Sequence, residues 1–312
     1  MRIETKNKKR NLFGLSNKSQ LQLQSMVIPA VIFVIIFCYI PMYGNIIAFK
    51  DLNIVRGFAA SPWVGFKYFK EFFTDINFTL VLKNTLGINI IGLIVSFPAP
   101  IIFALLLNEI RLMRFKKCVQ TISYLPHFVS WAVYGGFVLN VLSPSNGILN
   151  LIAVNLGIID NPINFIGQAD SFWGIMITAS LIKGLGWGSI IYIAAISGVN
   201  QEIYESATID GAGRLQKMWY ITLPSIAPTI SIMLIFAVSG ILNSGYEKYF
   251  ILQNPLNLDT SEVIDTYVFK LGIQQMRYSY ATAVGLAKSL VAILLLVTAN
   301  WASKKISDNG LY

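Results

Sequence analysis

The chain has 312 residues, of which 55% are hydrophobic and only 12% are charged, and its mean hydropathy is +0.61. A soluble domain of this length carries roughly 25% charged residues, so the composition excludes an ordinary soluble domain and indicates a membrane protein. The formal net charge of +9 does not indicate nucleic-acid binding, because the basic residues lie in short clusters between apolar segments.

Six apolar segments are each long enough to cross a membrane, which takes about 20 largely apolar residues in a helix. The predicted spans are residues 26–49, 80–107, 121–143, 171–197, 226–252 and 280–302. The first is too long for a cleavable signal peptide, and no cleavage site follows it. We therefore predict an all-α, multi-pass membrane protein. It has a basic cytoplasmic N-terminal arm (1–25), a transmembrane domain (26–302) and a cytoplasmic tail (303–312).

The basic clusters predict the orientation of these spans, because Lys and Arg collect on cytoplasmic loops. With six spans, all four clusters fall on one side of the membrane, and the facing loop 144–170 has no Lys or Arg. The clusters are the N-terminal arm, residues 111–117, Arg214 with Lys217, and Lys304 with Lys305. Loop 50–79 also contains basic residues and is an exception. Both termini are therefore predicted to be cytoplasmic.

Two loops on the predicted outer side carry apolar segments. Loop 50–79 is rich in aromatic residues at spacings of three and four, which predicts a short helix at the outer interface. An aromatic belt at the headgroup level accounts for that pattern most simply. Loop 144–170 has turn sequences (PSNG and DNP) around an apolar stretch, which predicts a short helix that caps a pore or docks a partner.

The chain lacks the residue patterns that catalysis requires. It has no phosphate-binding loop and no nucleophile elbow, and its one histidine, His127, has no second residue with which to bind a metal. Cys38 and Cys118 lie in or beside predicted spans, where cysteine commonly acts as a small apolar filler. We therefore expect neither an enzyme nor a resident cofactor. The energy for any transport has to come from another subunit or from an ion gradient.

A polar stretch, residues 198–225, interrupts the apolar pattern between the fourth and fifth spans. Asn200 is a suitable cap for a helix over about residues 201–210. Glu202 and Glu205 lie in its first turns, where the helix dipole favours negative charge. The residues Ile203, Ala207 and Asp210 line one side of that helix, with Tyr204 and Thr208 beside them.

Gly211 is predicted to end this helix, because glycine readily adopts the left-handed conformation found at helix ends. A second apolar helix follows and ends at Pro224, where the next span begins. The pattern therefore predicts two helices joined by a sharp turn and facing the cytoplasm. Such a short, rigid and non-catalytic segment is typical of a docking element.

The order Glu-x-Ala, three residues, Gly, nine residues, Ile-x-Leu-Pro closely resembles the EAA motif of permease subunits in ABC importers. The matching residues are Glu205, Ala207, Gly211, Ile221, Leu223 and Pro224, with Ser206 at the central position. The segments IPMYGNIIAFKDLN, SPWVGFKYFKEFF, GYEKYFIL and EVIDTYVFKLGIQQMRYSYATAVGL extend the resemblance over nearly the whole chain. They resemble the carbohydrate-uptake branch that serves oligosaccharide and polysaccharide importers. The resemblance implies the type I ABC importer permease fold.

The resemblance also implies a set of partners. In that family the short helix is the coupling helix, which fits into a groove of the ATPase subunit. The residues expected at this contact are Glu202, Tyr204, Glu205, Ala207, Asp210, Gly211 and Gly213. The other implied partners are a second homologous permease, an extracellular solute-binding lipoprotein, an oligosaccharide and membrane lipid. Two ATP-binding subunits would hold the ATP and Mg. The permease itself would lie in the plasma membrane of a bacterium. The alternative is a plain connector between two spans.

Polar residues of the fourth and fifth spans are candidates for the sugar path, which in the family is lined mainly from these two spans. Exposing such residues to lipid costs a few kcal/mol each, so they face the bundle interior. On a continuous fifth helix Gly240, Asn243 and Glu247 would share one face. The candidate path residues are Trp187, Gly240, Asn243, Ser244, Tyr246 and Glu247.

Roles in helix packing or charge balance are also open to these polar residues. Asn243 and Ser244 could form hydrogen bonds that pack helices together. Lys183, near the middle of the fourth span, could neutralise Glu247 or extend its ammonium to the membrane surface. For the whole chain, the alternative is a secondary transporter or channel driven by an ion gradient. That class favours inverted repeats with acids in both halves, whereas the EAA-like stretch occurs once.

Overall fold

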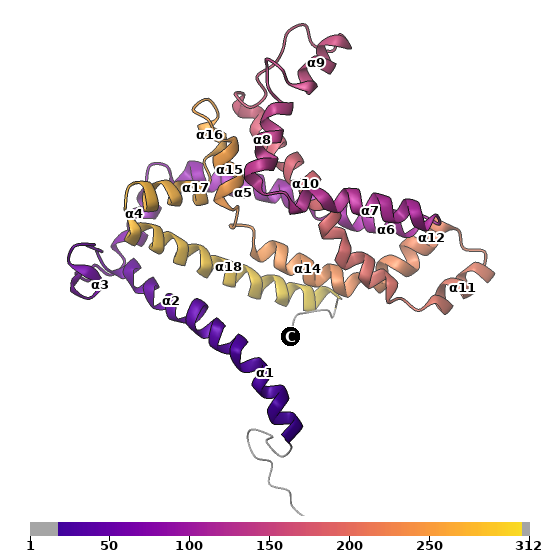
Figure 1. Cartoon of the computed structure of the whole chain (residues 1–312), viewed down its shortest axis with the longest axis horizontal. Coiled ribbons are helices and arrows are strands. Elements are labelled where there is room, and N and C mark those ends of the chain that lie inside the picture. The colour runs from indigo at the N-terminus through magenta and orange to yellow at the C-terminus, as the bar shows by residue number, and fades with distance from the viewer. Residues whose placement is uncertain (1–17, 308–312) are drawn as a thin grey trace, which may run out of the picture.

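A computed structural model describes residues 18–307 of the chain. Within that range the secondary structure is helical, apart from one isolated bridge between Lys50 and Trp63. Helix α1 (Lys18–Val34) runs apart from the main bundle, and α9 (Ile148–Asn155) projects from another edge (Figure 1).

Four of the predicted spans are long apolar helices in the structure. They are Gln24–Phe49, Phe78–Asn108, Ala169–Ser197 and Tyr278–Lys305. The first consists of α1, η1 (Ile35–Tyr39), α2 (Ile40–Met42) and η2 (Tyr43–Phe49); the second of α5 (Phe78–Ser96) and α6 (Pro98–Asn108); the third of η3 (Ala169–Ser171) and α10 (Phe172–Ser197); the fourth is α18 (Tyr278–Ser307). These four helices confirm the all-α membrane architecture.

The expected continuous third span, residues 121–143, is instead two helices. Helix α7 (Met113–Phe128) ends at an extended Val129, and α8 (Trp131–Val141) begins after Ser130. The reason is a set of side-chain contacts. The Lys183 ammonium donates to three carbonyls at the end of α7, and the Ser130 hydroxyl accepts a bond from Val133 N at the start of α8.

The expected continuous fifth span, residues 226–252, is also interrupted. Helix α14 (Ala227–Ser239) and α15 (Tyr246–Leu252) are separated by residues 240–245, which we call the interior break. Gly245 has a φ of +72°, a left-handed conformation that strains other residues. On the other side of α14, the helical run Arg214–Ser225 meets it at an angle of 62°. Counting this bent pair as one span gives five candidate spans in the described range.

The remaining helices are short. They are α3 (Gly57–Ala60), α4 (Lys67–Thr74), α11 (Gln201–Ile209), α12 (Arg214–Lys217), η4 (Met218–Thr222), α13 (Leu223–Ser225), α16 (Leu258–Ser261), α17 (Ile264–Phe269) and η5 (Lys270–Gln274). Helices α4 and α9 lie in loops 50–79 and 144–170, for which short helices are predicted, and α11 is the predicted helix after Asn200.

Helix α10 is the centre of the packing, since it contacts α5, α6 and α7. Its Phe172 and Met176 pack in one buried cluster with Tyr249, and its Tyr192 and Ile196 pack in another with α6. A third buried cluster joins α4, α5, α17 and α18. By contrast, none of the most apolar 18-residue window of the first span is buried within this chain.

Candidate functional site

The first candidate site is the segment made of α11, Gly211, α12, η4 and α13, which we call the coupling element. Asn200 caps α11, because its side-chain oxygen accepts a hydrogen bond from Glu202 N at 3.0 Å. Gly211 has a φ of +81° and turns the chain back toward α12. The predicted arrangement of two helices joined by a sharp turn is therefore present in the structure.

Side-chain hydrogen bonds hold the two arms of the coupling element together. The hydroxyls of Tyr204 and Thr222 are 2.9 Å apart, and Lys217 Nζ donates to Thr208 Oγ1 at 2.6 Å. A hydrogen bond from Gly213 N to Gln216 Oε1, at 2.7 Å, fixes the start of the second arm. These contacts make the element a stiff unit, because each joins or fixes residues on either side of the turn.

The outer surface of the coupling element combines acidic and apolar side chains. Glu202 and Glu205 are exposed, Ile209 is 87% exposed and Tyr220 is 81% exposed. A concavity of about 380 Å³ lies between the arms, and it is lined by Ala207, Asp210, Gly211, Ala212, Gln216, Lys217, Tyr220 and Ile221. Large apolar side chains that gather on an exposed surface mark an interaction site.

The second candidate region is the interior break. One carboxylate oxygen of Asp265, on α17, accepts hydrogen bonds from the backbone N–H groups of Ser244 and Gly245 at 2.8 and 2.9 Å. Its other oxygen is ion-paired with Lys288 of α18, and both side chains are largely buried. Asn89 of α5 donates to Ser244 Oγ at 2.7 Å. Three helices thus hold the break in one conformation.

This geometry overturns the expected common face of Gly240, Asn243 and Glu247. The face requires a continuous helix, and the chain is not helical between residues 240 and 245. Candidate path residues line four cavities instead, and Gly240 and Asn243 meet in one of about 280 Å³. Asn243 and Tyr246 line one of about 730 Å³ beside Asp265, and Gly240 lines another of about 320 Å³.

The fourth cavity has a volume of about 450 Å³ and joins the end of α7 to α10 and α15. It is lined by His127, Phe128, Val129, Ser130, Trp131, Ser180, Lys183, Gly184 and Glu247, and we call it the Glu247 cavity. At its edge the rings of His127 and Trp187 are stacked, with centroids 4.4 Å apart. Trp187 is 46% exposed.

Lys183 forms no direct ion pair with Glu247, whose carboxylate acts on it only at longer range, and its side chain is buried. Its Nζ donates to the carbonyls of Pro126, His127 and Val129 at 2.5–3.0 Å, and the residue is only 8% exposed. No carboxylate lies within 4.0 Å of this ammonium in residues 18–307. Glu247 therefore carries the accessible charge of the cavity.

Several residues that define this region are absent from the sequence-based prediction. Asp265 and Lys288 hold the interior break, and Lys248 and Tyr249 line the cavity of about 320 Å³. A lone charge within an apolar segment requires a partner or a function, and that rule points to these lysines and to Asp265. Among the described residues, no group of three or more His, Cys, Asp or Glu side chains is placed to hold a metal ion.

Comparisons with known proteins give a consistent result. Residues 96–308 match the family described as the binding-protein-dependent transport system inner membrane component. Protein LplB of Bacillus subtilis (strain 168) is 44% identical over 92% of this chain and 90% of its own length. In the same organism, the polygalacturonan/rhamnogalacturonan transport system permease protein YteP is 41% identical over 98% of this chain and 94% of its own length.

The fold is also similar to solved structures. One is a chain of a bacterial ABC transporter involved in the import of the acidic polysaccharide alginate, with a TM-score of 0.84 and 39% identity. The match covers 93% of this chain and 97% of that chain. The bacterial alginate ABC transporter has also been solved in complex with an alginate pentasaccharide-bound periplasmic protein, with a TM-score of 0.84 and 38% identity. The helical fold, the coupling element and these matches agree. The chain belongs to the family of binding-protein-dependent transport system inner membrane components and is a permease subunit of an ABC importer, not an enzyme.

Proposed function

We propose that this permease forms half of the transmembrane path for an oligosaccharide, which an extracellular solute-binding lipoprotein delivers. The observation that carries the proposal is the coupling element, an internally hydrogen-bonded unit whose outer surface is acidic and apolar. The saccharide class is supported by the relatives, since YteP is named for polygalacturonan and rhamnogalacturonan and the similar structure for alginate.

The coupling element docks on one of two ATP-binding subunits, which hold the ATP and Mg. Glu202, Glu205 and Asp210 are exposed and supply charged contacts. Tyr204 is bonded to Thr222, so it sets the position of α11. The small residues Ala207 and Gly211 leave room for the partner at the concavity and the turn, and Gly213 contributes its backbone N–H, which bonds to Gln216 at the start of the second arm.

The Glu247 cavity supplies one part of the sugar path. A sugar presents hydroxyl groups, which donate to a carboxylate, and C–H faces, which pack on aromatic rings. Glu247 offers the carboxylate, and the Trp187 and His127 stack offers aromatic surface at the edge of the same cavity. Asn243, Ser244 and Tyr246 of the neighbouring segment line or support the path on its other side.

The first span supports a second, homologous permease as partner. None of its apolar window is buried in this chain, and Phe33 and Phe37 are among its exposed side chains. The partner permease covers one part of that surface and membrane lipid covers the rest. The protein lies in the plasma membrane of a bacterium with both termini in the cytoplasm. Arg214 Nε lies 4.0 Å from Glu109 Oε2, just before the basic cluster at residues 111–117, which supports a common side of the membrane for the two clusters.

Charge reversal on α11 tests the coupling contact. In the importer reconstituted with its ATP-binding subunits, Glu205→Lys should reduce ATP hydrolysis stimulated by the loaded solute-binding protein by about tenfold or more, while the permease remains in the membrane. Reversing a charge in a docked interface costs several kcal/mol in unfavourable cases. Lys304→Glu, a charge reversal of equal size at the exposed end of α18, is the control and should have no effect. Normal stimulation in Glu205→Lys would contradict the assignment.

Cysteine labelling tests the orientation. After replacement of Cys38 and Cys118 by alanine, Ile158→Cys in the loop after α9 should react with an impermeant thiol reagent added outside whole cells. Ser206→Cys on α11 should react only after the cells are opened. Both positions are exposed in the isolated chain, so the membrane alone separates them. The reverse pattern would overturn the orientation and the coupling role together.

A further inference from the structure

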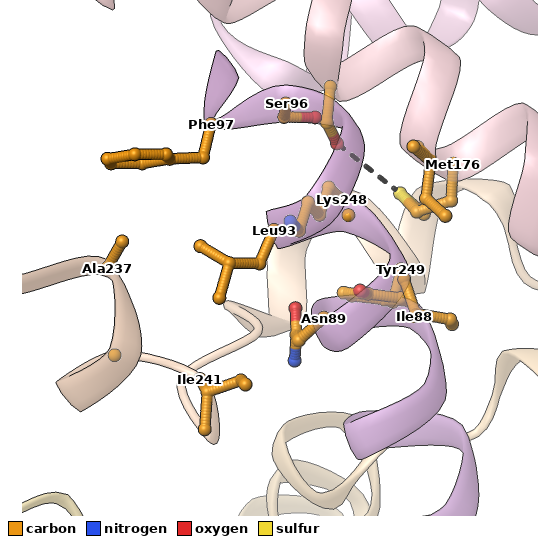
Figure 2. A pocket seen from close by; sticks show the side chains of 14 residues that line it. Ile88, Asn89, Leu93, Ser96, Phe97, Met176, Ala237, Ile241, Lys248 and Tyr249 are labelled. Atoms are coloured by element: carbon orange, nitrogen blue, oxygen red, sulfur yellow. Dashed lines mark hydrogen bonds between the residues drawn. The ribbon is translucent and has the colours of Figure 1, made fainter. Parts of the chain in front are cut away.

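The cavity of about 320 Å³ that Gly240 lines has a polar lining that the path described above does not use. It lies between α5, α10, α14 and α15 (Figure 2), and we call it the Lys248 cavity. Most of its lining is apolar, and its polar side chains are Asn89, Ser96, Ser180, Lys248 and Tyr249. Small-molecule pockets measure about 300–1,000 Å³, so its volume suits a single sugar ring.

Tyr249 brings an unpaired hydroxyl to this cavity. The residue is 0% exposed, and its Oη is the one buried side-chain polar atom without a hydrogen-bond partner in the part of the chain that the structure describes. The neighbouring Ser244 hydroxyl oxygen already accepts a hydrogen bond from Asn89 at 2.7 Å. Figure 2 shows the Tyr249 hydroxyl pointing into the cavity. A buried donor without an acceptor is unfavourable, so this hydroxyl is suited to a ligand.

Lys248 brings a positive charge without a carboxylate in direct contact. Its Nζ lies 5.2 Å from the centre of the Tyr249 ring, and no carboxylate lies within 4.0 Å of it among residues 18–307. Two acids that could have served are engaged elsewhere: Asp265 pairs with Lys288, and Glu247 lines the Glu247 cavity. An ammonium group within a bundle requires an opposite charge or a ligand.

We propose that the Lys248 cavity binds an acidic sugar residue, whose carboxylate accepts hydrogen bonds from Lys248 and Tyr249. The oligosaccharide is therefore a uronate-bearing one, an inference that rests on the proposed function above. A neutral sugar would give Tyr249 a hydroxyl acceptor but would leave Lys248 without a directly bonded anion. A carboxylate satisfies both groups at once, and its hydrogen bond to an ammonium is about twice as strong as one between neutral groups.

Binding measured without the solute-binding protein tests this proposal, because recognition then depends on the permeases. The permease pair and its ATP-binding subunits, purified in lipid nanodiscs, are titrated in a thermal-shift assay. The acidic probes are trigalacturonate and trimannuronate, and galactotriose is the neutral probe. Inorganic phosphate and added phosphatidylglycerol are tested in parallel, since both also present anionic oxygens. We expect at least one acidic probe to stabilise the complex and galactotriose to bind about tenfold more weakly or worse.

Two variants assign the effect to the cavity. Lys248→Met should weaken binding of the acidic probe by about ten- to a hundredfold. Tyr249→Phe should weaken it several-fold and leave the melting temperature of the unliganded complex unchanged or higher, because the substitution removes an unpaired hydroxyl. A purely structural Tyr249 would leave binding unchanged. Lys67→Met, which removes an exposed charge in the outer loop, is the matched control.

The remaining outcomes overturn the proposal and not the importer function. Equal binding of acidic and neutral probes, no binding of either acidic probe, or unchanged acidic binding in both variants would contradict an acidic-sugar site. A response to phosphate or phosphatidylglycerol alone that is lost in Lys248→Met would assign the cavity to phosphate or lipid headgroups. Failure of the importer function itself would appear in the separate assay of stimulated ATP hydrolysis.

Discussion

The coupling element and the segment around the interior break differ in whether their polar side chains have hydrogen-bond partners. In the coupling element Tyr204, Thr208 and Lys217 are hydrogen-bonded within the element, while large apolar side chains face outward. Around the break the apolar side chains are buried, and Lys248 and Tyr249 carry polar groups without hydrogen-bond partners in the described range. The first arrangement suits a rigid unit that a partner pushes. The second suits a region in which a passing solute supplies the missing hydrogen-bond partners.

The largest effect on stability is expected at Asp265, which bonds to the interior break from α17. Asp265→Asn removes the charge that pairs with Lys288 and leaves a buried ammonium unpaired, which costs about 3 kcal/mol or more. We expect a lower melting temperature of the purified complex and loss of uptake. The double variant Asp265→Asn with Lys288→Met removes both charges and should recover a part of the stability. If Asp265→Asn alone is as stable as the unmodified protein, the break does not depend on this ion pair.

A smaller effect is expected at the turn of the coupling element. Gly211 has a φ of +81°, and a side chain there strains the backbone by about 1–2 kcal/mol. Gly211→Val should therefore displace α11 and reduce stimulated ATP hydrolysis several-fold, with little change in membrane insertion. Gly213 has a φ of −71° and ordinary space for a Cβ, so Gly213→Ala is the matched control and should be tolerated. Equal activity of both variants would show that coupling does not require this turn.

The smallest structural disturbance is expected in the Glu247 cavity, because the side chains of Trp187 and Glu247 are both exposed. Trp187→Ala and Glu247→Ala should reduce uptake of the cognate oligosaccharide several-fold, while assembly with the ATP-binding subunits and basal ATP hydrolysis remain unchanged. Trp301→Ala, at an exposed tryptophan of α18, is the control. Uptake at the original rate in both cavity variants would place the path elsewhere, and loss of assembly would favour a packing role.

The coupling element could be predicted well from the sequence because its structure is local. Asn200 bonds to a residue two positions away, and Gly211 acts through its own backbone. The interruptions of the third and fifth spans could not be predicted, because residues distant in the chain cause them. Lys183 reaches carbonyls more than 50 positions earlier, and Asn89 reaches Ser244 across 155 positions. Apolar periodicity locates a membrane segment, but it does not show where a side chain from elsewhere in the chain interrupts its helix.

The same limit accounts for the outcome at the candidate path. The face of Gly240, Asn243 and Glu247 follows from helical spacing, and that spacing has no meaning where residues 240–245 leave the helix. Trp187 and Glu247 nevertheless lie at or near one cavity, because each belongs to an intact helix, α10 and α15. Individual polar residues can therefore be identified from sequence more reliably than their arrangement.

The isolation of the first span also bears on how the protein is made. This segment precedes the other described spans in the chain, and its most apolar window is not buried by them. A membrane helix satisfies its backbone hydrogen bonds internally, so this one is stable in lipid by itself. Its insertion can be complete before the later spans are translated. Its end at η2, where Ala48 is buried in a cluster with residues of α18, then packs on the bundle in a separate step.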